Sequence, residues 1–349
     1  MMLYFNAAVD DEWNTTGNWW EDYLCTVPAG TTSDDTVPTA YDDVTIIAGV
    51  VSTYGPAPVA YTLVAPSTAY VNLNSLHVLA YALFADGAAF GGSMTCDGPV
   101  EFRGASTANA GTITGNCFFS EGVSSGNAPY NGGPITGDCE FGPWAYNSST
   151  ITGDCLFSGN YSTNDGSIIG DVVFSGEYSM NSMAGTITGT VDFTLGSAVV
   201  NEGIINGDVA FGGSSANNGT INGNVTFEAN SINSAMIVGN ASFFGGSAYN
   251  GGSGIVDGSA YFYGDAYNNG IINFGFFYGS SIHFGNANGA RFYDDSSNRN
   301  GSVSGVAYFH SASSVITTMN IANENGVAPF NGVASLSMPF ADVLGTGLL

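Results

Sequence analysis

The residues best placed to do chemistry are cysteines that recur at a fixed place in a short pattern. Cys117, Cys139 and Cys155 each stand two positions after a glycine in three successive segments, and valine takes that place in the next segments. Cysteine in such a position behaves as a small apolar residue. The C-x-x-C spacing of zinc sites is absent. We therefore expect a column of buried, reduced thiols, with a disulfide or a metal site within the column as the alternatives.

Acidic residues form a second recurring set. An aspartate directly follows the glycine in four segments, at Asp138, Asp154, Asp171 and Asp208. This spacing predicts a column of carboxylates along one outer edge, where a solvated charged edge would oppose aggregation. Calcium bound between Asp and Asn oxygens is the alternative, and it is the one cofactor that the sequence suggests. The paired carboxylates that glycoside hydrolysis requires cannot be picked out from the uniform repeats.

Tyrosines and histidines complete the candidates. Four tyrosines lie beside or near turn asparagines, where exposed rings could bind sugars or simply cover a corner: Tyr130, Tyr146, Tyr249 and Tyr267. The three histidines lie far apart in the sequence, at His77, His283 and His310. Neither a metalloprotease helix motif nor a nucleophile elbow is visible. We therefore predict no catalytic residues.

Most of these residues belong to one repeated segment, I-x-G-x-[C/V/A]-x-F. Its glycine recurs from Gly98 to Gly305 at a mean spacing of about 17 residues. Weaker copies centre on Gly275 and Gly289, and the first copy places Cys96 in the isoleucine position. A repeat of this length is typical of proteins built by stacking identical units.

Two apolar positions of the repeat predict the core. The isoleucine position includes Ile113, Ile135 and Ile151. Tyr293 fills the last position of the repeat in one copy, and phenylalanine fills it in most others, including Phe119, Phe141, Phe157, Phe174, Phe193, Phe211, Phe227 and Phe243. Alternating apolar residues predict a strand with one buried face. Phenylalanines stacked on one another would form an offset aromatic column.

Asparagines mark the turns of the repeat. They stand six residues before the glycine at Asn131, Asn147, Asn164, Asn201, Asn217, Asn233 and Asn269. Asn181 and Asn250 stand two positions earlier, as if their turns had gained two residues. Asparagine tolerates left-handed backbone and bonds its own turn, so a column of asparagines is expected at one corner.

These patterns predict an all-β fold, a parallel β-solenoid of about 13 short coils with N- and C-terminal caps. An antiparallel array of hairpins with Asn-Gly turns is the alternative, but hairpins usually alternate two strand patterns and this sequence repeats one. We expect three parts: residues 1–90 as an N-terminal capping or attachment module, 91–310 as the solenoid, and 311–349 as a C-terminal cap or assembly segment. Caps are needed because a terminal coil exposes an unpaired strand edge.

Charge and hydropathy exclude several classes of function. The chain has 29 acidic residues, three arginines and no lysine, for a net charge of −26. Nucleic-acid binding depends on clustered Lys and Arg, so we expect none. No apolar segment of about 20 residues is present, so we expect no membrane insertion. The N-terminus lacks the basic and apolar regions of a secretory signal. Either a signal has been removed, which the initial Met-Met argues against, or the protein leaves its cell by another route, of which lysis with an assembled virus particle is one.

The N-terminal region resembles the entry module of many bacterial and phage β-solenoid surface proteins. The resemblance lies in Trp13, Gly17-Asn18-Trp19, Val37-Pro38 and Asp42-Asp43-Val44-Thr45-Ile46. Repeats such as Gly223-Asn224-Val225-Thr226-Phe227 resemble those of phage fibre, spike and decoration proteins. The similarity covers about 300 residues, in short motifs of low complexity.

The resemblance implies a non-enzymatic structural protein on a virion surface, built as a homotrimer. Its partners would be other virion proteins and host surface glycans. No catalytic residue carries over from the family. A bacterial extracellular filament subunit or adhesin is the first alternative, and a polysaccharide-degrading tailspike is the second.

Overall fold

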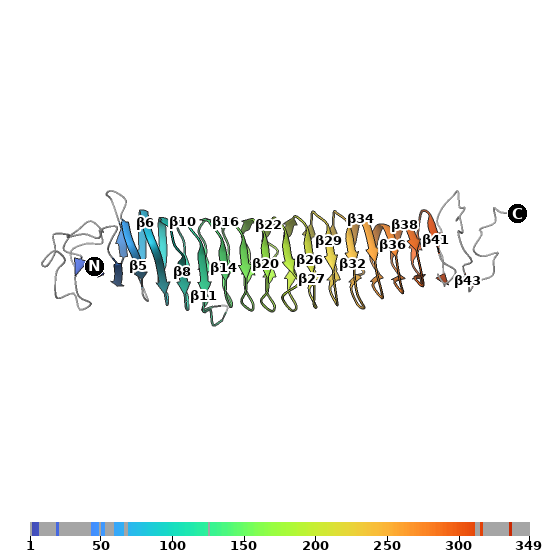
Figure 1. Cartoon of the computed structure of the whole chain (residues 1–349), viewed down its shortest axis with the longest axis horizontal. Helices are drawn as coiled ribbons and strands as arrows, with labels where there is room; N and C mark the ends of the chain where they lie inside the picture. The colour runs from blue at the N-terminus through green and yellow to red at the C-terminus, as the bar shows by residue number, and fades with distance from the viewer. Residues whose placement is uncertain are drawn as a thin grey trace. The chain divides into compact units, whose positions relative to one another are not determined.

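The computed structural model of the chain describes residues 2–6, 19–20, 43–48, 50–52, 59–65, 69–124, 126–310, 315–316 and 335–336. These residues confirm the predicted fold, an all-β parallel β-solenoid, with about 15 turns instead of the expected 13. The chain divides into two compact units, residues 1–179 and 180–349. Within each unit, corresponding strands of successive coils lie side by side (Figure 1).

The first unit contains twenty strands in the described residues. In chain order they are β1 (Met2–Asn6), β2 (Trp19–Trp20), β3 (Asp43–Ala48), β4 (Val50–Ser52), β5 (Val59–Ala65), β6 (Tyr70–Ala85), β7 (Ala89–Cys96), β8 (Val100–Arg103), β9 (Ala108–Asn109), β10 (Thr112–Thr114), β11 (Cys117–Ser120), β12 (Tyr130–Asn131), β13 (Ile135–Thr136), β14 (Cys139–Phe141), β15 (Tyr146–Asn147), β16 (Thr150–Thr152), β17 (Cys155–Phe157), β18 (Thr163–Asn164), β19 (Ser167–Ile169) and β20 (Val172–Phe174).

The second unit contains the remaining described strands. They are β21 (Met180–Asn181), β22 (Thr186–Thr188), β23 (Val191–Phe193), β24 (Val200–Asn201), β25 (Ile204–Asn206), β26 (Val209–Phe211), β27 (Ala216–Asn217), β28 (Thr220–Ile221), β29 (Val225–Phe227), β30 (Ile232–Asn233), β31 (Met236–Ile237), β32 (Ala241–Phe243), β33 (Tyr249–Asn250), β34 (Ile255–Phe262), β35 (Tyr267–Asn268), β36 (Ile271–Phe277), β37 (Ile282–His283), β38 (Asn286–Phe292), β39 (Ser297–Asn298), β40 (Ser302–Val303), β41 (Ala307–Phe309), β42 (Val315–Ile316) and β43 (Ser335–Leu336).

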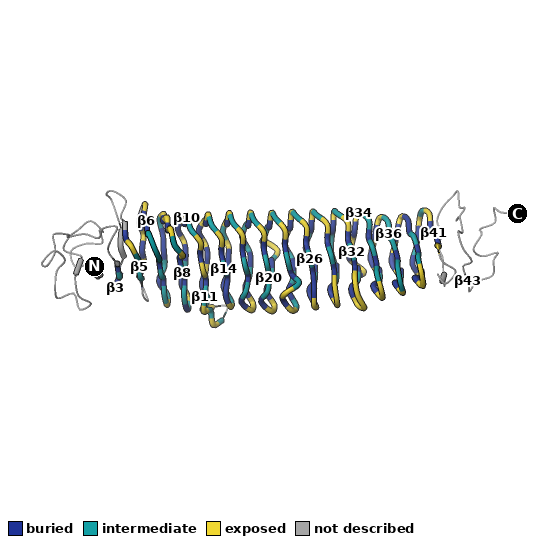
Figure 2. Tube along the Cα trace, viewed as in Figure 1, coloured by how far each residue is buried: buried dark blue, intermediate teal, exposed yellow. Residues whose placement is uncertain are grey.

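A typical coil has three short strands, and each pairs in parallel with the same strand of the next coil. Thus β12, β13 and β14 pair with β15, β16 and β17, which aligns Asn131 with Asn147, Ile135 with Ile151 and Phe141 with Phe157. Like residues therefore lie over like residues. Figure 2 shows the consequence as buried positions that recur from coil to coil along the described part of each unit.

Stacked phenylalanines form the centre of the core. In the first unit the rings of Phe102, Phe119, Phe141, Phe157 and Phe174 stack with centroids 4.6–4.9 Å apart. In the second unit a column from Phe193 to Phe309 has spacings of 4.7–5.0 Å. All of these rings are buried. Strand spacing near 4.8 Å sets the interval, which suits offset aromatic stacking.

The glycine of the repeat is required by the close approach of stacked turns. Gly137, Gly153 and Gly170 have φ values of 146°, 150° and 157°. A Cβ atom on Gly153 would lie 2.3 Å from the carbonyl oxygen of Gly137, and one on Gly170 would lie 2.2 Å from that of Gly153. A side chain at this position would therefore collide with the backbone of the preceding coil, which explains why glycine recurs.

The predicted asparagine column is a buried hydrogen-bonded ladder. In the first unit Asn131 donates to Asn147 at 2.7 Å, and Asn147 donates to Asn164 at 2.8 Å. In the second unit the side-chain amide of each asparagine donates to the side-chain oxygen of the next at 2.8 Å, in the order Asn181, Asn201, Asn217, Asn233, Asn250 and Asn268. The placement of Asn181 and Asn250 agrees with their longer turns. These contacts satisfy buried amides, which would otherwise destabilise the fold.

The expected frame is shifted in two coils, by two residues at Gly275 and by one at Gly289. Gly275 pairs with Ala260 and Ala290, so it occupies the small inward position and is not the turn glycine. Phe277 and Phe292 consequently fill the phenylalanine column, and Tyr293 lies outside it. Gly289 is not the turn glycine either, because it pairs with Phe274 and the next residue, Ala290, takes the inward position. Here β36 and β38 run straight through the place where other coils turn at glycine, and buried side chains set the register.

Two further placements differ from expectation. Asn268 continues the ladder, and Asn269 is an exposed neighbour. Met94 pairs with Ile113 in the isoleucine column, so Cys96 lies two residues beyond that position, although it is also buried. Both differences arise because turns of variable length separate the strands, so counting back from a glycine loses the register.

Parallel pairing begins before residue 91, where the solenoid was expected to start. β3 pairs in parallel with β5, and β6 pairs in parallel with β5, β7 and β8. Residues 69–90 therefore form coils like those that follow. Most of the predicted 311–349 segment lies outside the described residues, as do Trp13, Gly17, Asn18, Val37, Pro38 and Asp42.

Candidate functional site

The predicted thiol column lies in the core of the first unit. Cys117, Cys139 and Cys155 are buried and free, and they occupy aligned positions on β11, β14 and β17. Each Sγ lies 3.7–3.9 Å from a glycine carbonyl oxygen two residues earlier. Hydrogen bonding with a neighbouring thiol, together with burial, raises the pKa of Cys139 and of Cys155 well above the usual value. A raised pKa keeps these groups as unreactive thiols.

The aspartates of the repeat cap the backbone of the next coil. Asp138 accepts a hydrogen bond from the backbone N–H of Asp154 at 2.9 Å, and Asp154 accepts one from that of Asp171 at 2.8 Å. Asp208 does the same for Asn224 at 2.7 Å in the second unit. Among the described residues, no group of three or more His, Cys, Asp or Glu side chains is placed to hold a metal ion. The column therefore has a structural role in addition to its surface charge.

An open groove in the first unit runs along this acidic edge. It has a volume of about 410 Å³ and is lined by Asp138, Asp154, Asp171, Phe118, Leu156 and Val173, among others. A second groove of about 310 Å³ includes Tyr81, Glu101 and Ser120. Both are shallow surfaces on the strands that carry the phenylalanine column, and both combine carboxylates with apolar side chains.

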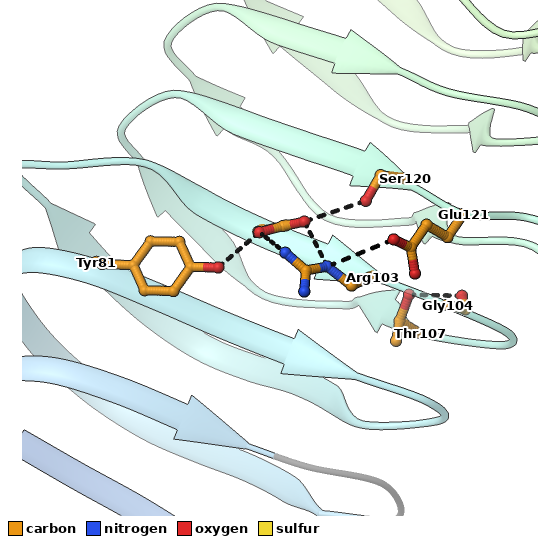
Figure 3. A network of polar contacts seen from close by, with 7 residues as sticks. Tyr81, Arg103, Gly104, Thr107, Ser120 and Glu121 are labelled. Carbon is orange, nitrogen blue, oxygen red and sulfur yellow. Dashed lines mark hydrogen bonds and ion pairs between the residues drawn. The ribbon is translucent and has the colours of Figure 1, made fainter.

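Glu101 is the centre of a polar network on this face, and Figure 3 labels its partners Tyr81, Arg103 and Ser120. It accepts hydrogen bonds from Tyr81 at 2.5 Å, from Arg103 at 2.7 and 2.8 Å, and from Ser120 at 3.2 Å. Arg103 also lies 3.9 Å from Glu121. The donors come from β6, β8 and β11, so stacking of three coils assembles the network.

The network holds Glu101 in its ionised form. Burial alone would raise the pKa of Glu101, but hydrogen bonds from Arg103 and Tyr81 outweigh burial and lower it. Burial and the hydrogen bond to Glu101 raise the pKa of Tyr81 to about 12. A carboxylate held ionised by donors on both oxygens is suited to structural pairing. It is poorly suited to general acid catalysis, which needs a raised pKa.

The tyrosines predicted near the turns form stacked pairs. Tyr130 and Tyr146 have ring centroids 5.6 Å apart, and Tyr249 and Tyr267 are 4.6 Å apart. Tyr130 also hydrogen-bonds to Ser148 at 2.6 Å, and Tyr146 hydrogen-bonds to Asp165. Their hydroxyls are thus partly engaged within the protein, which fits the interpretation that these rings cover a corner.

The histidines do not form a common site. His283 occupies a ladder position next to Asn268, whereas His77 pairs with Asp97 at 3.1 Å in the first unit. His310 stacks on Tyr293 at 4.5 Å and ends a row of aromatic side chains that sequence reasoning missed. A signal for this row is visible in the sequence, because the positions flanking the buried phenylalanine become aromatic near residue 260.

Comparison with known protein families, with curated proteins and with solved structures finds no match. The fold and the site therefore rest on the chain's own residues. In the part of the chain that the structure describes, no helix is long and apolar enough to span a membrane.

Proposed function

We propose that this protein is a non-enzymatic structural protein of a phage virion surface, as a fibre, a spike or a capsid decoration. The observation that carries the proposal is the uniform stacking of buried Phe and Asn columns over successive coils in both units. Each coil is stabilised by its neighbours, so the fold lengthens by repetition and suits a spacer. The resemblance of the repeats to phage fibre and spike proteins supports the same role.

The reactive side chains support a structural role as well. The described cysteines are buried, the repeat aspartates cap backbone N–H groups, and Glu101 is paired with Arg103. The proposal includes assembly as a homotrimer and contact with other virion proteins and host surface glycans. With a net charge of −26, copies of the chain would associate through their least acidic surfaces.

Two alternatives remain distinct from this proposal. A bacterial filament subunit or adhesin would share the fold but would be found on cells. A polysaccharide-degrading tailspike needs one carboxylic acid with a raised pKa beside a second carboxylate. Glu101, which accepts hydrogen bonds from Tyr81, Arg103 and Ser120 on the grooved face, has a lowered pKa, which favours the structural role over the enzymatic one.

A mass-spectrometric inventory of purified virions and of cell-surface fractions from the same culture tests the proposal. We expect peptides of this chain in virions, at a copy number comparable to that of other structural proteins. Recovery from cell-surface filaments alone would favour the adhesin. Release of reducing sugar from capsular polysaccharide by the purified protein would favour the tailspike.

A further inference from the structure

Two outward positions flank the buried phenylalanine column, and they change character along the second unit. In its first coils they hold small or acidic residues: Asp192, Ala210, Thr226 and Ser242 before the phenylalanine, and Thr194, Gly212 and Glu228 after it. In its later coils they hold Tyr261, Phe276, Arg291 and Tyr308 before it, and Phe244, Tyr263, Tyr278, Tyr293 and His310 after it. We call these nine later residues the aromatic face.

The core does not require aromatic residues at these places. Phe193 and Phe211, which lie beside small outward residues, stack with centroids 4.8 Å apart. Phe262 and Phe277, which lie beside the aromatic face, also stack at 4.8 Å. The same coil geometry therefore forms with either kind of neighbour, so the spacing of the core does not explain why aromatic residues gather on this face.

Stacking determines which part of each ring is presented to solvent. Tyr263, Tyr278 and Tyr293 have centroids 5.0 and 4.6 Å apart and are within 7° of parallel. Their faces cover one another along the stack, so ring edges and hydroxyls face outward. The edge of an aromatic ring carries partial positive charge, and a phenol can donate a hydrogen bond. The surface therefore favours ligands rich in hydrogen-bond acceptors.

Arg291 adds a full positive charge to this surface. Its guanidinium carbon lies 6.0 Å from the ring centroid of Phe276 and 5.2 Å from that of Tyr308, within cation–π range. Its Nε atom is buried and has no hydrogen-bond partner among the described residues. Arg103, by contrast, makes two hydrogen bonds to Glu101. Arg291 is thus a positioned cation that no described carboxylate neutralises.

We propose that the aromatic face binds an oligosaccharide that carries a carboxylate. The carboxylate would pair with Arg291, since guanidinium and carboxylate form short, charge-assisted hydrogen bonds. Hydroxyls such as those of Tyr278 and Tyr293 would donate to sugar oxygens. The proposal names the residues and the ligand class of the glycan contact in the proposed function, and it rests on that function for its biological setting. It assigns the contact to residues other than the stacked tyrosines at the turns.

The size of the aromatic face favours a slender ligand over a second copy of the chain. Strands lie ~4.8 Å apart and alternate residues ~7 Å apart, so the face measures roughly 20 Å by 10 Å. A stable protein interface buries about 800 Å² on each partner, several times this area. A short sugar chain lying across four or five coils would cover the face.

Earlier coils of the second unit show which replacements the fold accepts. Arg291→Ala introduces alanine, the residue that occupies the equivalent position as Ala210. Tyr278→Thr introduces threonine, the residue that occupies the equivalent position as Thr194. Both replacements occur naturally at the equivalent position of another coil, so the fold should be kept, as circular dichroism would check. Tyr267→Ile is the matched control, because it copies Ile282, with which Tyr267 pairs in another column.

Calorimetric titration of the full chain with sialyllactose and trigalacturonate, and with neutral lactose and maltotriose, provides the measurement. We expect at least one carboxylated probe to bind more tightly than both neutral ones. Arg291→Ala should weaken that binding by about tenfold or more. Tyr278→Thr should weaken it less, and Tyr267→Ile should leave it unchanged.

Three results would overturn the inference: no binding of either carboxylated probe, equal binding of neutral probes, or unchanged binding by Arg291→Ala. A change of oligomeric state in Arg291→Ala, seen by light scattering without a change in sugar binding, would indicate a second copy as the occupant and would also overturn it. Binding is measured on purified protein, so absence of the chain from virions would contradict the proposed function alone.

Discussion

At the scale of the residue, His283 is the exception within the asparagine ladder. Its Nδ1 lies 3.0 Å from the amide nitrogen of Asn268, and its Nε2 lies 3.3 Å from the carbonyl oxygen of Ser302. Asn268 uses its own oxygen to accept from Gly270, so its amide N–H groups face the imidazole. The neutral ring fits both contacts, with Nδ1 accepting and Nε2–H donating. Burial lowers the pKa of His283 to about 4.

This arrangement makes the stability of the second unit depend on pH. The folded-state pKa lies below the unfolded value of about 6.5. The stabilisation is therefore complete above pH 6.5 and is lost as the pH falls towards 4. We expect the free energy of unfolding to decrease by about 2 kcal/mol between pH 7 and pH 5 from this group. Urea denaturation at several pH values measures the decrease, and His283→Asn should remove most of it. An equal pH dependence in that variant would contradict the assignment.

A single ladder asparagine satisfies several buried groups at once. Asn217 accepts from Asn201 and donates to Asn233, both at 2.8 Å, and it also accepts from the backbone of Gly219 at 3.3 Å. Asn217→Ala would leave these partners unsatisfied, and each buried unsatisfied group costs about 1–3 kcal/mol. We expect a loss of about 3 kcal/mol or more in chemical denaturation. Asn218→Ala, at the exposed neighbour, should change stability little, and similar losses in the two variants would argue against the ladder.

At the scale of the element, the tight turn between two strands of a coil depends on glycine. Gly153→Ala would place a Cβ 2.3 Å from the carbonyl oxygen of Gly137, at a φ of 150°. Backbone strain of this kind costs about 1–3 kcal/mol. We expect a lower midpoint of thermal unfolding. Gly126→Ala is the control in the same unit, because nothing lies within 4 Å of its Cβ position. An unchanged midpoint for Gly153→Ala would show that coils can separate at this turn.

At the scale of the whole molecule, the net charge of −26 opposes association except through weakly charged surfaces. The segment 332–349 has one acidic residue, Asp342, and no basic residue, and it is rich in Leu. We predict that deleting this segment leaves a folded β-rich protein that no longer assembles, because its apolar side chains would contribute about 1.5–3 kcal/mol each when buried. Light scattering compares the two forms. An unchanged oligomeric state would identify the segment as a cap only.

The repeat made the fold predictable from the sequence alone. Alternation of Ile, Cys or Val, and Phe defines a strand with one buried face, and recurrence of one strand pattern requires like to stack on like. The recurrence of a glycine at the place of Gly115 is also visible in the sequence. Its reason, the close approach of turns in successive coils, comes from the structure. These features are local, so they appear in most copies of the repeat.

Only the tertiary structure decided the register where turns differ in length. Phe292 and Asn268 belong to the columns because buried rings and amides align across coils, whereas counting from Gly289 or Gly275 misplaced them. The polar network around Glu101 and the position of Arg291 between Phe276 and Tyr308 combine side chains from separate coils. Such contacts depend on the spacing between strands in space, which residue order does not contain.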